Sequence, residues 1–296
     1  MNNINYDCID YDKLPKKFPP QHQDIQPGIE AKMNPKPIFD NPCYKGSEKL
    51  KGKVALITGG DSGIGRAIAI AFAKEGANVA ISYLYEEIDA KTTKSCVEDY
   101  GSKCILYMGD ISSKSFCKSL VDCVVKDFGK IDILINNAGV QFPQESIEDI
   151  SQDQLELTYK VNIFPMFYLT QAALCYMKKG STIVNTASVT AYQGHVKLID
   201  YSSTKGAVVT FTRSLSQSLV TKGIRVNAVA PGPIWTPLIV SSFSDEDIKK
   251  FGFDVPMKRA GQPFELAPAY VYLASEDSSY VTGQVIHVNG GTIVDS

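Results

Sequence analysis

Three side chains within residues 188–205 have the types and spacing needed to act on a carbonyl group. Tyr201 and Lys205 are four positions apart, so on a helix they share one face, with an ammonium beside a phenol. A nearby cation lowers the pKa of a phenol from its usual value of about 10, so we expect Tyr201 to exchange a proton near neutral pH. Ser188 follows a predicted strand at residues 182–186, and its hydroxyl can hold a substrate oxygen against Tyr201. Reduction of a carbonyl also needs a hydride, which no side chain supplies.

A glycine-rich turn at residues 59–65 has the form of a binding site for the phosphates of a dinucleotide. Residues 53–58 before it have the apolar centre of a buried strand, and residues 66–75 after it have helical spacing. Glycines let a phosphate approach the main chain closely, and the N-terminus of a helix favours an anion. An ordinary tight turn is the alternative, but it would need fewer than the four glycines found here.

The next strand leaves the choice of dinucleotide open. It is predicted at residues 78–83 and ends with Ser82 and Tyr83, where a dinucleotide-binding fold often has an acid for the ribose 2′-hydroxyl. Glu86 comes only later, and no Arg or Lys occurs before Lys91. NAD and NADP therefore remain alternatives.

From residue 51 onward, short apolar segments alternate with helical patterns, which is typical of a parallel sheet covered by helices on both faces. Further strands are expected near residues 103–107, 131–135, 182–186, 224–230 and 283–291. A long helical pattern covers residues 151–178, where we expect Pro165 to kink the helix. We predict an α/β fold for residues 51–296: one Rossmann-type, doubly wound domain with a seven-stranded parallel sheet.

Residues 1–50 differ from the rest of the chain. They hold seven of the fifteen prolines among polar side chains and show no helical or strand period. Such a segment is either disordered or extended over the body or over a neighbouring subunit. Its scattered apolar residues, including Phe18 and Met33, favour docking. We therefore predict a Pro-rich N-terminal arm over residues 1–50.

The composition argues against several kinds of partner. A formal net charge of −2 offers no basic surface for nucleic acid or an anionic membrane. No apolar run approaches the roughly 20 residues of a membrane span, and no signal peptide is evident, so we expect a cytoplasmic protein. The seven cysteines are scattered without a Cys-x-x-Cys pair, so we expect reduced thiols and no metal site.

These segments together resemble the short-chain dehydrogenase/reductase family over about residues 50–296. Residues 58–65 look like its TGxxxGxG cofactor turn, residues 136–139 like its NNAG element, and residues 231–232 like its nicotinamide-side turn. The arm followed by Gly-Gly-Asp-Ser-Gly-Ile-Gly is similar to a bacterial subgroup of glucose/ribitol-dehydrogenase-like or general-stress oxidoreductases. Since members are commonly homotetramers, the resemblance implies a homotetramer that interconverts a carbonyl compound with a secondary alcohol, including sugars and polyols.

The resemblance also implies the site residues. The catalytic residues would be Asn162, Ser188, Tyr201 and Lys205. Tyr201 would be the general acid/base, Lys205 would lower its pKa and hold the nicotinamide ribose, and Asn162 would hold a water in a proton relay. The cofactor-binding residues would be Gly59, Asp61, Ser62, Gly63, Ile64, Gly65, Tyr83, Asp110, Ile111, Asn137, Ala138, Gly139, Thr186, Tyr201, Lys205, Pro231, Gly232, Ile234 and Thr236.

Several alternatives stay open for individual residues. Asp110 could accept a hydrogen bond from an adenine amino group or cap the next helix. Trp235 lies in the predicted nicotinamide-side turn, so its fluorescence should report cofactor binding. Substrate determinants are expected in residues 141–144, 191–199 and 232–261.

A dinucleotide-binding sensor or scaffold without turnover is the alternative to an enzyme, and the complete set of four catalytic residues argues against it.

Overall fold

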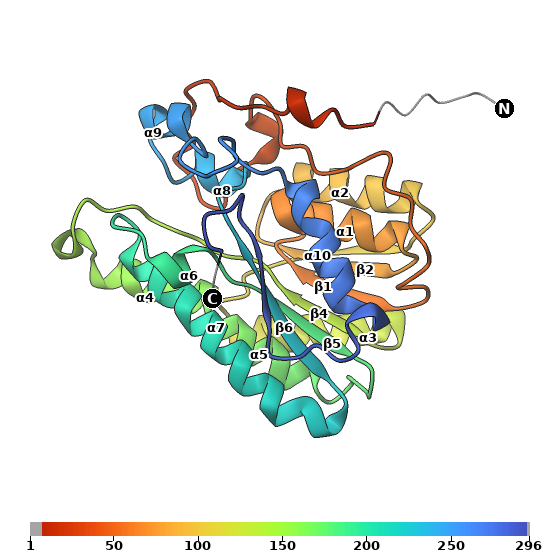
Figure 1. The fold of residues 1–296 in the computed structure, drawn as a ribbon. Helices are drawn as coiled ribbons and strands as arrows, with labels where there is room; N and C mark the ends of the chain where they lie inside the picture. The colour runs from red at the N-terminus through yellow and green to blue at the C-terminus, as the bar shows by residue number, and fades with distance from the viewer. Residues whose placement is uncertain (1–7, 295–296) are drawn as a thin grey trace.

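The computed structural model describes residues 8–294 and is built on a parallel sheet in the order β3-β2-β1-β4-β5-β6-β7 (Figure 1). The strands are β1 (Val54–Thr58), β2 (Asn78–Tyr83), β3 (Cys104–Met108), β4 (Ile133–Asn136), β5 (Thr182–Thr186), β6 (Arg225–Pro231) and β7 (Val285–Val288). The strand order reverses direction between β1 and β4, as in a Rossmann-type sheet. The predicted fold class, a seven-stranded parallel sheet flanked by helices, is confirmed.

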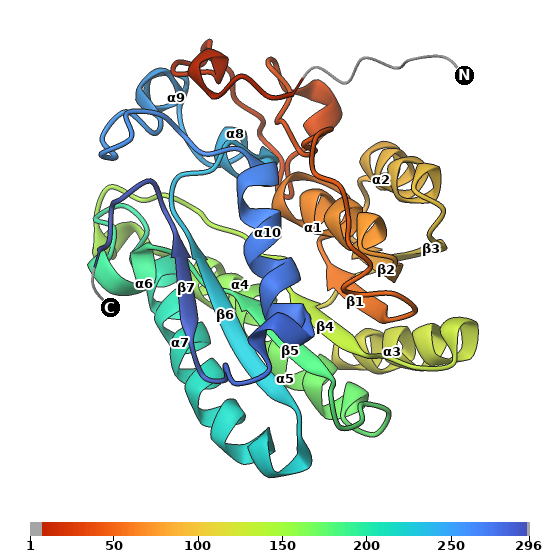
Figure 2. The same cartoon turned by 45° about the vertical axis from the view of Figure 1, so that its right-hand side comes forward.

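Helices cover both faces of the sheet (Figures 1 and 2). One face carries α1 (Gly63–Lys74), α2 (Glu87–Asp99) and α10 (Pro263–Ala274), and the other carries α3 (Lys114–Phe128), α5 (Phe164–Ala173) and α7 (Ile199–Leu219). Side chains of β1 alternate between the two cores: Ile57 packs with α1 and α10, and Leu56 packs with α3 and α5. Because both faces of the sheet are covered at β1, residues 54–57 are continuously apolar rather than alternating.

The predicted long helix is two helices, which corrects the expectation of a kink at Pro165. The first, α4 (Gln152–Asn162), ends at Ile163, whose φ of −120° departs from helical geometry. Pro165 then lies in the first turn of α5, where a missing N–H removes no helical hydrogen bond. The break leaves Asn162 as the last residue of α4, at the cavity end of the sheet.

The remaining helices are short and lie near the ends of the strands. They are α6 (Thr190–Gln193), α8 (Pro237–Val240), α9 (Asp245–Lys250) and the 3-10 turns η1 (Tyr11–Lys13), η2 (Glu30–Lys32), η3 (Ile147–Asp149), η4 (Val220–Lys222) and η5 (Glu276–Ser278). The segment after β6 was expected to be an irregular loop, and it contains α8 and α9. Within the described residues, no helix is both long and apolar enough to cross a membrane.

The part of the N-terminal arm that the structure describes, residues 8–50, is docked on the body along α8, α9 and α10 (Figure 2). Phe18 stacks on Trp235 with ring centroids 3.7 Å apart, and Met33 is buried in the same cluster. A main-chain hydrogen bond of 2.8 Å joins the Gln23 N–H to the Val240 carbonyl. The first seven residues of the predicted arm lie outside the described residues.

A buried ion pair also anchors the arm. Glu30 of η2 is 1% exposed and pairs with Arg66 of α1, and its Oε2 accepts a hydrogen bond of 2.7 Å from the Gly63 N–H. The Asp89 carboxylate of α2 accepts the N–H groups of Glu30 and Ala31 at 2.7 and 3.0 Å. The arm is therefore fixed to the first turn of α1, which is also the predicted phosphate-binding turn.

One disulfide corrects the prediction that all cysteines are reduced thiols. Cys8 and Cys43 are bonded, with their Cα atoms 5.4 Å apart. The scattered spacing of the cysteines concealed this pair because the docked arm returns on itself and brings together residues 35 positions apart. The other cysteines, Cys96, Cys104, Cys117, Cys123 and Cys175, are free.

Candidate active site

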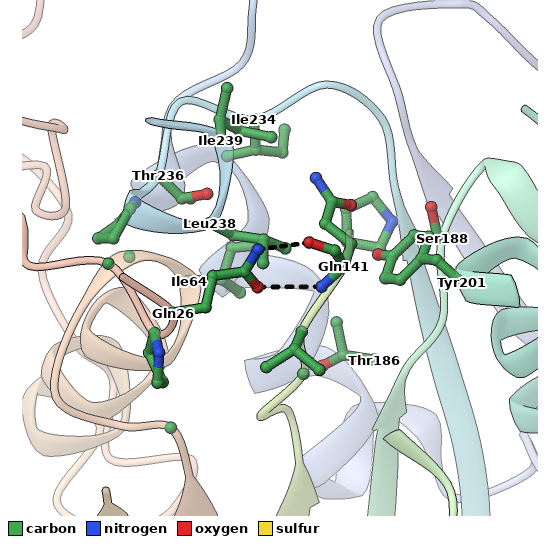
Figure 3. Close-up of a pocket in the computed structure, with 18 of the residues that line it drawn as sticks. Gln26, Ile64, Gln141, Thr186, Ser188, Tyr201, Ile234, Thr236, Leu238 and Ile239 are labelled. Carbon is green, nitrogen blue, oxygen red and sulfur yellow. Dashed lines mark hydrogen bonds between the residues drawn. The ribbon is translucent and has the colours of Figure 1, made fainter. Parts of the chain in front are cut away.

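A cavity of about 900 Å³ opens at the carboxyl ends of β1, β4, β5 and β6. Open α/β sheets bind ligands at this edge, where the strand order reverses. Every predicted site residue lines this cavity except Gly65 and Asn162, which support it from behind. Figure 3 shows Ser188 and Tyr201 on one side of it and Ile234, Thr236 and Leu238 on the other. The described residues contain no group of three or more His, Cys, Asp or Glu that could hold a metal ion.

Tyr201 and Lys205 lie on one face of α7, as their spacing predicts. The Lys205 Nζ is 5.4 Å from the centroid of the Tyr201 ring, and it donates a hydrogen bond of 2.8 Å to the Thr186 carbonyl oxygen. Both side chains are buried, at 7% and 4% exposure. The strand end of β5 thus holds the ammonium beside the phenol.

Burial changes the predicted protonation of this pair. It raises the pKa of Tyr201 to about 12, and the hydrogen bond with Ser188 opposes this rise only in part. Burial also lowers the pKa of Lys205 to about 8. The expectation that Lys205 brings the pKa of the phenol close to neutrality does not hold for the protein alone, because burial destabilises the phenolate more than the hydrogen bond with Ser188 stabilises it.

Ser188 is oriented by a residue that the sequence did not reveal. Its Oγ accepts hydrogen bonds from the Thr190 main-chain N–H at 3.1 Å and from the Thr190 hydroxyl at 3.0 Å. With these donors on the Ser188 oxygen, its own proton is available to the cavity and to Tyr201. Thr190 starts α6, so the turn from β5 into that helix sets the direction of the Ser188 hydroxyl.

The amide of Asn162 binds protein groups rather than the cavity. Its Oδ1 accepts the Val140 N–H at 2.8 Å, and its Nδ2 donates to the Val140 carbonyl at 2.9 Å and to the Thr204 hydroxyl at 3.1 Å. Asn162 therefore joins the loop after β4 to α7 at Thr204, the residue immediately before Lys205. Its predicted water-holding role stays a prediction, and its side chain positions the neighbouring main chain.

The glycines of the turn at residues 59–65 let main-chain atoms approach one another more closely than other residues would allow. Gly59 has a φ of +60°, which favours glycine, and a Cβ at residue 65 would lie 1.9 Å from the Gly59 carbonyl oxygen. The Asn137 amide donates to the carbonyls of Thr58 and Gly59 at 3.1 and 3.2 Å. Asn137 of the NNAG element thus fixes the conformation of the glycine turn through these two hydrogen bonds.

An acid does lie at the end of β2, although the sequence position suggested none. Glu86 precedes the first residue of α2 and turns back into the cavity, where it is 4% exposed. Asp61 of the glycine turn lies close enough that burial and the Glu86 charge together raise the pKa of Asp61 to about 7. The periodicity of the sequence could not predict that the Glu86 side chain enters the cavity, because the conformation of the turn before α2 sets its direction.

Asp110 lines the cavity and does not cap α3. Its carboxylate accepts the Ser112 N–H and hydroxyl, both at 2.8 Å, and Ser113 caps the helix instead. The capping alternative is therefore wrong, and the adenine contact stays a prediction.

The arm supplies part of the cavity wall, which the sequence did not predict. Gln26 accepts the Gln141 N–H at 3.1 Å and donates to the Gln141 carbonyl, and the two face each other in Figure 3. The same amide reaches the Ser241 carbonyl of α8 at 3.2 Å. Gln26 therefore links the arm, the loop after β4 and α8 across the cavity.

Two residues of the expected substrate segments lie differently from each other. His195 lines the cavity and remains exposed, and burial and the Lys197 charge lower its pKa. The Trp235 ring does not line the cavity: it stacks on Phe18 and donates to the Pro35 carbonyl at 2.9 Å. Trp235 is thus placed to report docking of the arm as well as events in the cavity.

Replacing Asp61 tests the effect of Glu86 and of burial on its carboxyl group, and the quantity measured is the free energy of unfolding. The pKa of Asp61 in the folded protein is raised to about 7. Its protonated carboxyl group therefore contributes fully to stability at pH values below the ordinary pKa of an aspartate, and this contribution is lost as pH rises through about 7. Asp61→Asn cannot titrate, so its free energy of unfolding relative to the original protein should increase by about 2–3 kcal/mol between about pH 5 and about pH 8. Urea unfolding at both pH values measures this. Asp99→Asn, at an exposed position at the end of α2, is the control, and an equal difference at both pH values would contradict the prediction.

Known proteins resemble this chain along most of its length. The family model described as Enoyl-(Acyl carrier protein) reductase matches residues 59–292. "Uncharacterized oxidoreductase YhxC" of Bacillus subtilis (strain 168) is 62% identical over 95% of this chain and 98% of its own. "Glucose and ribitol dehydrogenase" of Daucus carota is 53% identical over 94% and 98%. "NADPH-dependent aldehyde reductase 1, chloroplastic" of Arabidopsis thaliana is 53% identical over 93% and 98%.

Solved structures share the fold. A short chain dehydrogenase from Burkholderia cenocepacia J2315 in complex with NADP has a TM-score of 0.78 at 30% identity, covering 82% of this chain and 98% of that one. The 3-ketoacyl-(acyl-carrier-protein) reductase from Brucella melitensis complexed with NADH has a TM-score of 0.76 at 33% identity, with the same coverage. With its sheet order, its glycine turn and its Ser-Tyr-Lys cavity, this chain belongs to the short-chain dehydrogenase/reductase family of oxidoreductases.

Proposed function

We propose that this protein transfers a hydride between NAD or NADP and a carbonyl or secondary-alcohol substrate, with Tyr201 as the general acid/base. The observation that carries the proposal is the meeting of Tyr201, Ser188 and Lys205 in one cavity with the glycine turn. The printed names of the relatives, which are dehydrogenases and reductases, support the same reaction class.

The residues of the cavity fit a dinucleotide. The glycine turn forms a cradle that a Cβ at residue 65 would fill, and the first turn of α1 offers phosphates its N–H groups other than that of Gly63, which donates to Glu30. Ser82 Oγ and Glu86 Oε1 are buried at the β2 end without a partner in the described structure, as expected of groups that await a ligand. Residues near Thr236 and Pro231 would hold the nicotinamide end of such a cofactor, which would supply or accept the hydride.

The protein's own part is to move one proton and to hold one oxygen. In the reducing direction Tyr201 donates its phenolic proton to the substrate oxygen, and Ser188 donates a hydrogen bond to the same oxygen. The Lys205 ammonium then stabilises the phenolate that remains. Thr190 and Asn162 position these groups through the contacts described above. In the oxidising direction the same proton returns to Tyr201.

The substrate side of the cavity favours a hydroxylated compound. The Nε2 of Gln141 is buried at this wall and has no partner within the described structure. A substrate hydroxyl or carbonyl oxygen can accept its hydrogen bond. Gln193 and His195 add exposed polar groups to the same side. We therefore propose a sugar, polyol or small polar aldehyde as the substrate.

The assembly and location expected from the sequence remain proposals. Leu155, Leu157, Phe164 and Phe167 expose apolar side chains on α4 and α5, which supports subunit contacts and a homotetramer. We also propose a cytoplasmic location, and a division into an arm over residues 1–50 and a catalytic domain over residues 51–296.

A turnover assay tests the proposed function. The purified full-length protein is mixed with NADH or NADPH and a panel of small aldehydes, ketones and open-chain sugars, and loss of the reduced nicotinamide signal is followed. We expect carbonyl-dependent oxidation of at least one cofactor, and the reverse reaction with the matching alcohol. Tight cofactor binding without turnover of any carbonyl or polyol would contradict the proposal and favour a dinucleotide-binding sensor.

A further inference from the structure

Three glutamines of the arm each hold the main chain of one other residue with both ends of the side-chain amide. Gln21 and Gln23 hold residues of the arm itself: each accepts the N–H and donates to the carbonyl of the same partner. Gln26 instead reaches out of the arm and holds Gln141, in the loop after β4, whose N–H it accepts at 3.1 Å. Of these three glutamines, Gln26 alone lines the cavity. The same kind of contact that folds the arm on itself therefore also fixes a segment of the cavity wall.

A second amide holds the residue immediately before Gln141. Val140 donates its N–H to the amide of Asn162 at 2.8 Å, and its carbonyl accepts from the same amide at 2.9 Å. Asn162 is the last residue of α4 and one of the proposed catalytic residues. Two consecutive residues of one loop are thus held by two amides, one from the catalytic domain and one from the arm.

The side chain of Gln141 is a hydrogen-bond donor without a partner. It is 3% exposed, its Nε2 has no hydrogen-bond partner within the described structure, and it lines the same cavity as Ser188 and Tyr201 (Figure 3). A buried amide donor costs free energy unless a ligand accepts its hydrogen bond. Because Gln26 fixes the main chain of Gln141, it also determines where this donor lies.

The amide of Gln26 has no donor left for a substrate. Its Nε2 donates to the carbonyl oxygens of Gln141 and Ser241, the second at 3.2 Å, and its Oε1 accepts the Gln141 N–H. A contribution of Gln26 to substrate binding must therefore pass through the residues that it holds.

We propose that Gln26 is a positioning residue of the active site: through the main chain of Gln141, the arm directs the Gln141 amide toward a hydroxyl oxygen of the substrate. The inference rests on the proposed function, because it concerns the substrate of that reaction. A hydroxyl oxygen accepts the hydrogen bond of Nε2, whereas a hydrocarbon group in the same place leaves the donor unpaired. The protein therefore favours hydroxylated carbonyl compounds over their deoxy analogues, and this preference depends on Gln26.

Reduction of two aldehydes that differ only in their hydroxyl groups tests the inference. Glyceraldehyde and propanal are compared as substrates of the full-length protein, with NADH and NADPH both supplied. Gln26→Met keeps the length of the side chain and removes its amide. This variant should lower the ratio of kcat/KM for glyceraldehyde to kcat/KM for propanal by about fivefold or more. The change should come from a higher KM for glyceraldehyde, with kcat altered less than about twofold.

Two further variants separate positioning from a general loss of structure. Gln21→Met removes the same kind of contact inside the arm and should leave the aldehyde ratio unchanged. Gln141→Leu should lower the ratio, and combining it with Gln26→Met should cause no further loss, because Gln26 acts through Gln141. Additive losses in the double variant, or an equal fall in kcat/KM for both aldehydes in Gln26→Met, would overturn the inference.

A measurement on the main chain needs no substrate. The Gln141 N–H should exchange with deuterium at least about tenfold faster in Gln26→Met, whereas the Val140 N–H, held by Asn162, should keep its original rate. Unchanged exchange at Gln141, or an unchanged aldehyde ratio, would overturn the inference and leave the proposed function standing. Reduction of neither aldehyde by the original protein would also overturn the inference, and the wider panel of the turnover assay then decides the proposed function separately.

Discussion

Replacing Tyr201 by Phe should lower kcat/KM by about 1000-fold or more in either direction of the reaction. The substitution keeps the ring and removes one oxygen, so packing in α7 is retained and only the proton donor is lost. Ser188 and Lys205 remain in place, since Ser188 is oriented by Thr190 and Lys205 by the Thr186 carbonyl. The dissociation constant of the reduced cofactor should change less than about threefold, because phosphates and ribose are held elsewhere.

The control for this substitution is a second tyrosine nine positions earlier. Tyr192 of α6 does not line the cavity, and its hydroxyl is buried without a partner in the described structure. Tyr192→Phe makes the same chemical change and should leave kcat/KM within about twofold. Steady-state rates and cofactor titrations on both variants measure the contrast. Tyr201→Phe retaining more than a tenth of the original rate would show that another group supplies the proton.

Replacing Glu30 by Gln should destabilise the protein by about 3 kcal/mol. The variant keeps the size of the side chain but leaves the Arg66 guanidinium, itself 3% exposed, without its closest carboxylate. Removing one partner of a buried ion pair is costly because the other charge stays buried. Asp89 limits the loss, since its Oδ1 lies 3.6 Å from an Arg66 nitrogen.

Trp235 makes the release of the arm visible. It is the only tryptophan and lies between Phe18 and Pro35 of the arm, so loss of docking should shift its emission to longer wavelength. In a urea titration of Glu30→Gln, this shift should come before the loss of helical circular dichroism. Glu48→Gln is the control, because Glu48 pairs with Lys51 at the surface, with side chains 68% and 69% exposed. Equal unfolding midpoints for both variants would contradict the anchoring role of Glu30.

The sequence was sufficient for the parts of the site that follow local rules. The apolar residues of the sequence located β5 at residues 182–186. Four-residue spacing placed Lys205 on the same helical face as Tyr201. The glycines between a predicted strand and a predicted helix located the turn that joins β1 to α1, where Gly65 packs against Gly59.

The parts that could not be predicted depend on contacts between distant segments. Gln26 belongs to no recognisable sequence motif, and it reaches the cavity only because the arm docks beside α8. Cys8 and Cys43 meet for the same reason. The pKa of Tyr201 was predicted from one neighbouring charge, whereas burial, a property of the whole fold, has the larger effect.

The docked arm also has a consequence for the order of events during synthesis. Segments of the arm bind residues that are synthesised much later: Trp235 follows Pro35 by 200 residues, and Gln262 follows Ile38 by 224. Glu30 can pair with Arg66 as soon as α1 has formed, but until residues 235–260 have been made, Phe18 and Met33 lack the cluster in which they are buried. The part of the arm around Phe18 and Pro35 therefore reaches its final place only after α8 and α9 have left the ribosome.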